Sequence, residues 1–176
     1  ADLRGTQAAR SNAYNAISTM QVGEGGLAEM SNLMTRLREL GVQSASDTLG
    51  DKERVYLQQE ATSLTEEIDR ISKTTSFGDK KLLDGSNPVF DFHVGSSGNK
   101  ENVITYKAEA NATPDELNLA SIDITSKSGA KELLGNLDSA LEKVSKMRAG
   151  FGAMQSRLES TVNGLDVRSE NLAAAK

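Results

Sequence analysis

Three long stretches of the chain have the hydrophobic spacing of helices that pack along their whole length. Residues 1 to about 45 place Ala13, Met20, Leu27 and Met34 seven residues apart, which predicts one long amphipathic helix. Residues 51–72 predict a second helix, whose apolar stripe alternates intervals of four and three residues: Leu57, Ala61, Leu64, Ile68 and Ile71. Residues 129–176 predict a third, with a heptad seam formed by Leu137, Val144, Phe151, Leu158, Leu165 and Leu172.

Residues 73–126, between the second and third helices, have a different pattern, rich in glycine and containing both prolines. Apolar and polar side chains alternate over residues 89–94 and again over 103–108, as they do in half-buried strands. Gly95 to Asn102 would then close a β-hairpin, and Ile122 with Ile124 suggests a further short strand. The predicted fold is mainly α, an elongated antiparallel bundle of three long helices with a small β-hairpin region inserted mid-chain, together one core domain.

Two features interrupt or delimit the predicted helices. Gly23, Gly25 and Gly26 fall inside the first one, where each costs about 1 kcal/mol relative to Ala. We interpret them as a local bend or a close helix crossing rather than a ligand loop. Thr48 followed by Asp51 is a start signal for the second helix. Both chain ends fall inside a helical pattern, so we expect the termini at the same end of the bundle and a chain cut from a longer one.

Composition argues against most kinds of chemistry. The 176 residues carry a net charge of -5, no Cys and no Trp. They lack the Lys and Arg cluster that nucleic-acid binding requires and the long apolar stretch that spans a bilayer. The single histidine, His93, lies in a predicted strand, and Glu66, Glu67 and Asp69 fit a solvated helix face. We therefore expect no enzyme, no cofactor and no metal site.

The exposed side of the first helix carries Arg36, Arg38, Glu39 and Gln43 beside its apolar rows. Such charges can simply keep a rod soluble, or they can form a lateral contact surface for another protein. Periodicity alone leaves both interpretations open.

Several short motifs resemble those of bacterial flagellins and occur in the same order. Residues 37–45, LRELGVQSA, resemble the flagellin signature RELAVQSA, with glycine where alanine is usual. Residues 67–71, EIDRI, and 75–85, TSFGDKKLLDG, are similar to the family's EIDRI and TxFNGxxLLxG. Residues 92–95, FHVG, and 152–158, GAMQSRL, are similar to FQVG and GAxQNRL. The resemblance covers nearly the whole chain.

The resemblance implies a structural subunit of the flagellar filament, secreted through the flagellar export apparatus to the extracellular filament under its cap. It implies the core domain of a flagellin, without the terminal segments that line the inner tube of the filament. The partners would be other copies of the chain, and the isolated fragment would be monomeric. A hook-associated junction protein and a generic coiled-coil interaction module remain the alternatives; the coiled-coil module would dimerise through its seams.

The resemblance also implies recognition by the flagellin-sensing Toll-like receptor of animals. In the family this contact uses one face of the first helix, a glutamate of the second helix and an arginine of the last. The matching positions here are Arg36, Glu39, Leu40, Gln43, Glu60 and Arg157. The same face is expected to be buried between subunits of the filament.

Overall fold

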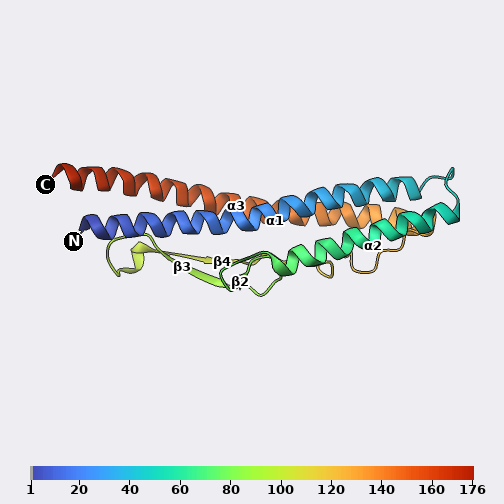
Figure 1. Ribbon diagram of the computed structural model, residues 1–176, viewed down its shortest axis with the longest axis horizontal. Coiled ribbons are helices and arrows are strands. Elements are labelled where there is room, and N and C mark those ends of the chain that lie inside the picture. Colours follow the sequence, from blue (N-terminus) through green and yellow to red (C-terminus); the bar gives the residue numbers. More distant parts are fainter. Residues whose placement is uncertain (1) are drawn as a thin grey trace.

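The computed structural model describes residues 2–176 as a long rod of three helices with a small β region along one side (Figure 1). The helices are α1 (Asp2–Ser44), α2 (Asp51–Thr74) and α3 (Lys127–Ala174). α2 and α3 both run antiparallel to α1, so the two ends of the chain lie at the same end of the rod. The 43 residues of α1 extend about 65 Å at 1.5 Å per residue. The predicted fold class is confirmed.

Three ion pairs show how α1 and α3 are aligned. Arg10 pairs with Asp166, Glu24 with Arg148 and Arg38 with Asp138. At the far end Lys127 Nζ lies 2.7 Å from Asp47 Oδ1, next to the turn between α1 and α2. As the residue number on α1 rises, the number of its partner on α3 falls, as expected for two antiparallel helices.

The core is a narrow line of side chains along the rod. α1 contributes Met20, Leu27, Met30, Met34 and Leu37, all fully buried. The heptad row of α3 faces them, with Leu137, Val144, Phe151, Leu158 and Leu165 buried. Leu172, the last of that predicted seam, is only half-buried, near the C-terminal end of α3.

The glycines of α1 lie where neighbouring elements approach closely, and the helix continues unbroken through them. A Cβ atom added to Gly23 would lie 2.7 Å from Cζ of Phe151, and one added to Gly26 would lie 2.7 Å from Oγ1 of Thr75. At Gly25 an added Cβ would meet nothing within 4 Å. The expected close crossing is therefore present at Gly23 and Gly26.

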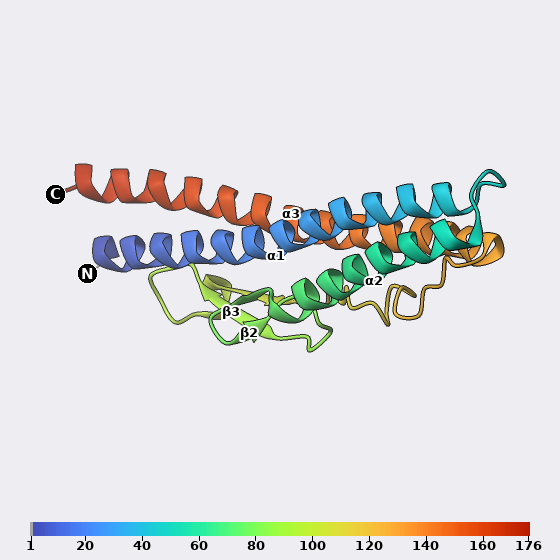
Figure 2. The same cartoon turned by 45° about the vertical axis from the view of Figure 1, so that its right-hand side comes forward.

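Two antiparallel hairpins follow α2 along the rod (Figures 1 and 2). β1 (Ser76–Phe77) pairs with β2 (Lys80–Lys81) around Gly78, whose φ is 62°. β3 (Val89–His93) pairs with β4 (Val103–Lys107), with the short 3-10 helix η1 (Lys100–Asn102) before β4. The larger hairpin is the predicted one, and Asn12 Nδ2 of α1 donates a hydrogen bond of 3.0 Å to the His93 carbonyl.

The chain from β4 to α3, residues 108–126, runs back along the rod and buries its apolar side chains: Ala108, Ala112, Leu117, Leu119 and Ile124. The prediction of a strand at Ile122 and Ile124 is wrong. The side-chain amide of Gln58 takes the place of a neighbouring strand. Its Nε2 donates to the Ile122 carbonyl at 3.2 Å, and its Oε1 accepts from the Ile124 amide at 2.8 Å.

The turn between α1 and α2 is held by a buried arginine. Arg54 Nε donates to the carbonyl of Ser44 and Nη2 to that of Ser46, both at 2.8 Å, while Nη1 contacts Asp51. The first of these bonds satisfies the carbonyl of Ser44, the last residue of α1, which the helix itself leaves unpaired. The second adds to the bond that the Ser46 carbonyl accepts from the Leu49 amide in the turn. Gly50 is the N-cap of α2, so the Thr48 start signal lies near the helix end without capping it.

Candidate protein-contact surface

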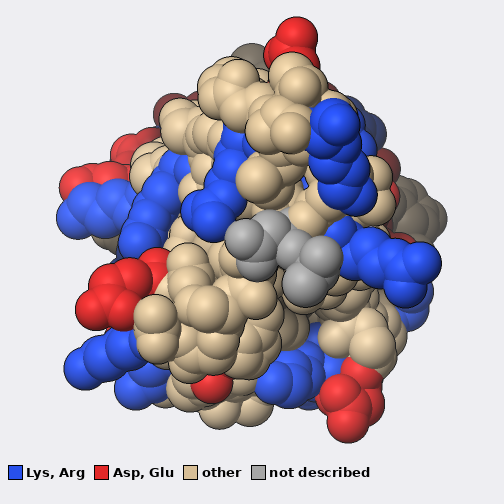
Figure 3. All heavy atoms as spheres, turned by 90° about the vertical axis from the view of Figure 1, so that its left-hand side faces the viewer, with Lys and Arg blue, Asp and Glu red and all other residues tan. Residues whose placement is uncertain are grey.

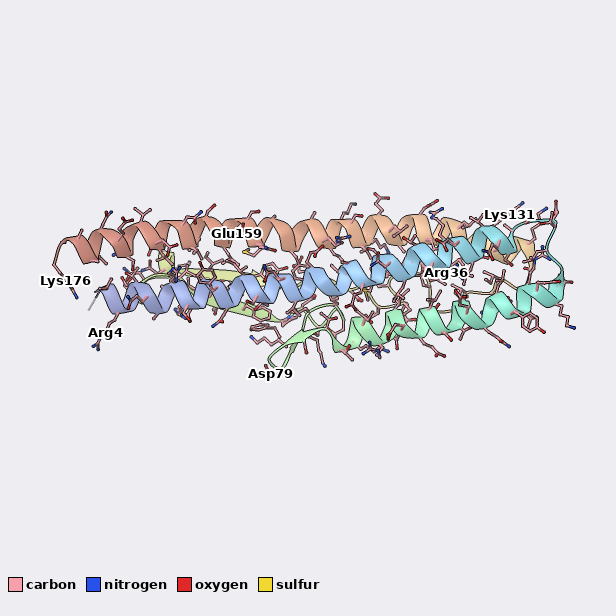
Figure 4. All side chains as sticks on the ribbon, turned by 45° about the horizontal axis from the view of Figure 1, so that its top comes forward. Arg4, Arg36, Asp79, Lys131, Glu159 and Lys176 are labelled. Carbon is pink, nitrogen blue, oxygen red and sulfur yellow. The ribbon has the colours of Figure 1, made fainter. Side chains whose placement is uncertain are left out.

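The predicted contact residues of α1 and α2 meet at the groove between these helices (Figure 4). Arg36 Nε and Nη2 donate to the two carboxylate oxygens of Glu60 at 2.6 and 3.0 Å. Arg36 Nη1 also donates to Glu39 Oε2 at 2.8 Å. One guanidinium therefore links two carboxylates on different helices, which fixes its orientation.

The ion pairs shift the charge equilibria of the cluster. Hydrogen bonding to Arg36 holds the pKa of Glu60 below its ordinary value, and hydrogen bonding to Glu60 and Glu39 raises the pKa of Arg36. Both side chains are more than 40% exposed, with 44% for Arg36 and 42% for Glu60, so water screens the pair and its effect on stability is small. The cluster presents an ordered, charged surface rather than a buried catalytic site.

Leu40 does not belong to this exposed surface, and the expectation that it contacts a receptor is corrected. Its side chain is 0% exposed and lies in the core with Leu37. The heptad spacing of α1 turns both leucines toward the core, and Gln43, one turn beyond Leu40, is exposed. Leu40 can therefore support the surface only by packing beneath it.

Arg157 lies apart from the Arg36 cluster. Arg38 is paired with Asp138, and Arg157 is about 19 residues further along α3, or about 30 Å along the rod. It is exposed and makes no ion pair within residues 2–176. The structure therefore brings together Arg36, Glu39, Gln43 and Glu60, and places Arg157 on a separate part of the rod.

Two other kinds of functional feature are absent from the described residues. No three acidic or histidine side chains among the described residues are arranged to hold a metal ion. None of the helices in residues 2–176 combines the length and the apolar character needed to cross a membrane. Viewed along the rod, Lys and Arg alternate with Asp and Glu around the perimeter (Figure 3). A narrow buried core covered by charged faces defines an elongated helical rod.

Comparison with known proteins identifies the family. The model of the bacterial flagellin N-terminal helical region matches residues 1–88, and that of the C-terminal helical region matches residues 134–176. The chain belongs to the bacterial flagellin family, whose members are structural proteins and not enzymes.

Relatives and solved structures agree with this assignment. The chain is 38% identical to a flagellin of Halalkalibacterium halodurans over 100% of its own length and 64% of the relative's. It is 36% identical to a flagellar filament 33 kDa core protein of Treponema phagedenis, over 99% of the chain and 65% of the relative. The crystal structure of Bacillus cereus flagellin superposes with a TM-score of 0.77, at 25% identity, covering 95% of both chains. The chain thus spans slightly less than two thirds of the length of these two relatives.

Proposed function

We propose that the protein is a structural subunit of the bacterial flagellar filament that assembles with copies of itself by helix packing. The observation that carries this proposal is the similarity to flagellins over the whole chain, one relative being named as a filament core protein. The structure of the rod supports this proposal. Its apolar side chains are already buried inside the chain, so the surface left for contact with neighbouring subunits is the exposed, charged side of the helices. Such a rod contacts neighbours through its outer faces.

Electron microscopy after induced polymerisation tests the proposal. The protein as the cell makes it is compared with residues 1–176 alone. We expect filaments from the cellular protein. A protein that stays monomeric under conditions in which another flagellin polymerises would remove filament assembly as its function.

A hook-associated junction protein is the second candidate, because the fold is shared with that class. A putative flagellar hook-associated protein of Vibrio parahaemolyticus superposes with a TM-score of 0.75 at 13% identity, which shows the fold alone. The higher identity to flagellins favours a filament subunit. A coiled-coil dimerisation module is disfavoured because Leu137, Val144 and Phe151 pack inside the chain. Analytical ultracentrifugation would show a monomer for the rod and a dimer for the coiled-coil module.

The same function implies a route and a place. A filament subunit of this family would leave the cell through the flagellar export apparatus and add beneath the filament cap, in the extracellular filament. The lack of Cys in the sequence suits such a route, because no disulfide has to form after export. Immunogold labelling of intact cells would show the protein along the filament.

Recognition by the flagellin-sensing Toll-like receptor is a second part of the proposal. The exposed cluster of Arg36, Glu39, Gln43 and Glu60 supports it, because a bidentate Arg–Glu pair across two helices presents a fixed pattern of charges. Arg157 would add a separate contact on α3.

A receptor reporter assay with the Arg36→Ala variant tests this contact. We expect a weaker signal, because the variant removes the guanidinium and frees Glu60. The matched control is Arg70→Ala, which removes another exposed arginine of the same groove that is paired with Glu67. Equal signals from wild type and Arg36→Ala would remove Arg36 from the contact.

A further inference from the structure

We propose that copies of this chain pack side by side through two unlike surfaces. The acidic face formed by α1 and α2 of one copy (the α1/α2 face) contacts the basic flank formed by α3 and β4 of the next (the α3/β4 flank). Tyr56 of the first copy lies in a hollow beside Gly150 of the second. The proposal rests on the proposed function, because it states how subunits of a filament contact one another. Contacts between unlike surfaces build rings or, where the rotation does not close, open helical filaments, whereas contacts between identical surfaces close a dimer.

The α1/α2 face is the pair of exposed stripes that border the groove between these helices. α2 contributes Glu53, Glu60 and Glu67 at intervals of seven residues, and α1 contributes Glu29 and Glu39. The glutamates still outnumber the cations on this face, which are Arg36, Lys52 and Arg70. Arg36 is shared by Glu39 and Glu60, and Arg70 pairs with Glu67.

The acidic excess on this face is concentrated at two positions. Glu29 and Glu53 make no ion pair within the described part of the chain. Glu29 lines a shallow hollow between α1 and α2 together with Arg70, which places both stripes on one surface. A partner for this face should therefore be basic and should meet Glu53 and Glu29 directly.

The α3/β4 flank has the complementary charge. Lys146, Arg157 and Arg168 follow one another on α3 at intervals of eleven residues, or three helical turns, so they share one side of the helix. Lys107 at the end of β4 lines the same hollow as Lys146, whereas Arg157 and Arg168 continue the row further along α3. Arg157, Arg168 and Lys107 make no ion pair within residues 2–176, and Lys146 approaches Glu142 only to 3.9 Å. The flank therefore offers three cations without an ion pair in the described residues, and a fourth, Lys146, that is only loosely paired with Glu142.

A hollow of about 360 Å³ opens on this flank between β4 and α3. Its apolar floor is formed by Tyr106, Ala110, Met147 and Phe151, and it is open because Gly150 has no side chain. Lys107, Lys146 and Glu109 surround the floor. An apolar floor with a mainly basic rim suits an aromatic side chain that is flanked by carboxylates.

Tyr56 on the α1/α2 face has these properties. It is 59% exposed, more than the other large apolar side chains that the structure leaves at the surface. Glu53 precedes it by three residues and Glu60 follows it by four, so two carboxylates lie next to it on the helix, together with the single cation Lys52 four residues before it. Tyrosine is among the residues that interfaces concentrate in their buried centres. Seating Tyr56 in the hollow would bring Glu53 close to Lys107 and Lys146.

The contact fixes the stagger between neighbouring rods. The Arg36–Glu60 pair places Tyr56 level with about residue 40 of α1, whereas the hollow lies at Phe151, which packs on Gly23. The two positions differ by about 17 residues, or roughly 25 Å along the rod. Each copy would therefore be shifted by about a third of a rod relative to its neighbour, which permits the contact to repeat without closing.

Disulfide cross-linking in filaments tests the proposal, because residues 1–176 contain no Cys. Tyr56→Cys and Gly150→Cys are introduced singly and together into the protein as the cell makes it. Both positions tolerate the change, since Tyr56 is exposed and a Cβ at Gly150 meets nothing within 4 Å. The matched control combines Gly150→Cys with Val42→Cys instead of Tyr56→Cys. Val42 is 55% exposed, but it lies about two thirds of a turn around α1 from Arg36, and so away from the proposed contact.

Oxidation should link the double variant into a ladder of multimers and the mixed single variants into dimers, while the Val42→Cys combination stays monomeric on a denaturing gel. Cα atoms must come within about 7 Å for such a bond. Filaments without a ladder, or an equal ladder from the control, would overturn the proposed contact and leave the filament function intact. Failure of the wild-type protein to form filaments would overturn the proposed function, and this contact with it.

A charge exchange keeps the proposal testable if Tyr56→Cys blocks assembly. Glu53→Lys should slow filament elongation several-fold, and adding Lys146→Glu to the same chain should restore it. Each variant is first compared with wild type by circular dichroism as a monomer. A double variant that elongates no faster than Glu53→Lys alone would contradict the facing of these two surfaces.

Discussion

The crossing of α1 and α3 at Gly23 allows a quantitative test of how the rod is packed. The Gly23→Ala variant would place a Cβ 2.7, 2.8 and 3.0 Å from three atoms of the Phe151 ring. Phe151 is 1% exposed, and its other side packs on Tyr106 with the ring centroids 6.1 Å apart. Overpacking of a core costs about 1–3 kcal/mol, whereas alanine in place of glycine inside a helix gains about 1 kcal/mol.

The hollow beside Gly150 gives the ring some room to shift, which places the overpacking cost in the middle of its range. We therefore expect Gly23→Ala to lower the free energy of unfolding by about 1 kcal/mol. Gly25→Ala is the matched control, because its Cβ would meet nothing within 4 Å, and it should raise that free energy by about 1 kcal/mol.

Denaturant unfolding followed by circular dichroism measures both variants under one set of conditions. A double variant that combines Gly23→Ala with Phe151→Leu completes the test. Its loss of unfolding free energy should be smaller than the sum of the losses in the two single variants, because the smaller side chain relieves the clash. Equal stabilisation by Gly23→Ala and Gly25→Ala would show that the close crossing does not constrain the rod.

Three further predictions concern other parts of the chain. Arg54→Met should lower the free energy of unfolding by about 1–3 kcal/mol, because it leaves the buried Ser44 carbonyl without its partner; denaturant titration measures this, and no loss would contradict the role of the arginine. Leu165→Ala should cost about 2 kcal/mol or more and Leu172→Ala clearly less in the same titration, since only Leu165 is buried; equal costs would refute the difference in packing. Because Arg36 lowers the pKa of Glu60 below its ordinary value of 4.5, the pair stabilises the fold above that pH and its contribution is lost as pH falls through the lower folded pKa. Stability measured from pH 7 to 3 should therefore fall less steeply in Arg36→Ala than in wild type, and parallel curves would contradict the linkage.

Hydrophobic spacing was sufficient to predict the helical rod. A side chain repeated every seven residues has to stay on one side of a helix, so Leu137, Val144 and Phe151 could be assigned to a seam without knowing what covers it. The spacing also places Leu40 inside, yet the resemblance to a receptor-contact motif placed it outside. A linear motif does not record which of its side chains face the core, and here the periodicity of α1 decided correctly.

The connections between helices were less predictable because their partners are distant in sequence. Ile122 and Ile124 alternate as a strand does, but their backbone pairs with the side chain of Gln58, and alternation does not distinguish the two. β1 and β2 have two residues each, too few for a period to show. The sequence alone gives no reason to expect Arg54 to be buried. Its partners, the carbonyls of Ser44 and Ser46, come within reach only when α1 and α2 pack together.

The repeats of the two proposed contact surfaces limit how far neighbouring rods can touch. Glu53, Glu60 and Glu67 repeat every seven residues, 3.5 per turn, whereas Lys146, Arg157 and Arg168 repeat every eleven, about 3.67 per turn. On straight helices of 3.6 residues per turn these rows drift in opposite directions around their helices, so they cross rather than remain side by side. Contact should therefore be closest near the hollow and weaken toward the end of α3. Lys146→Glu should slow filament elongation more than Arg168→Glu, as measured by light scattering on seeded filaments, and equal effects would indicate contact along the whole rod.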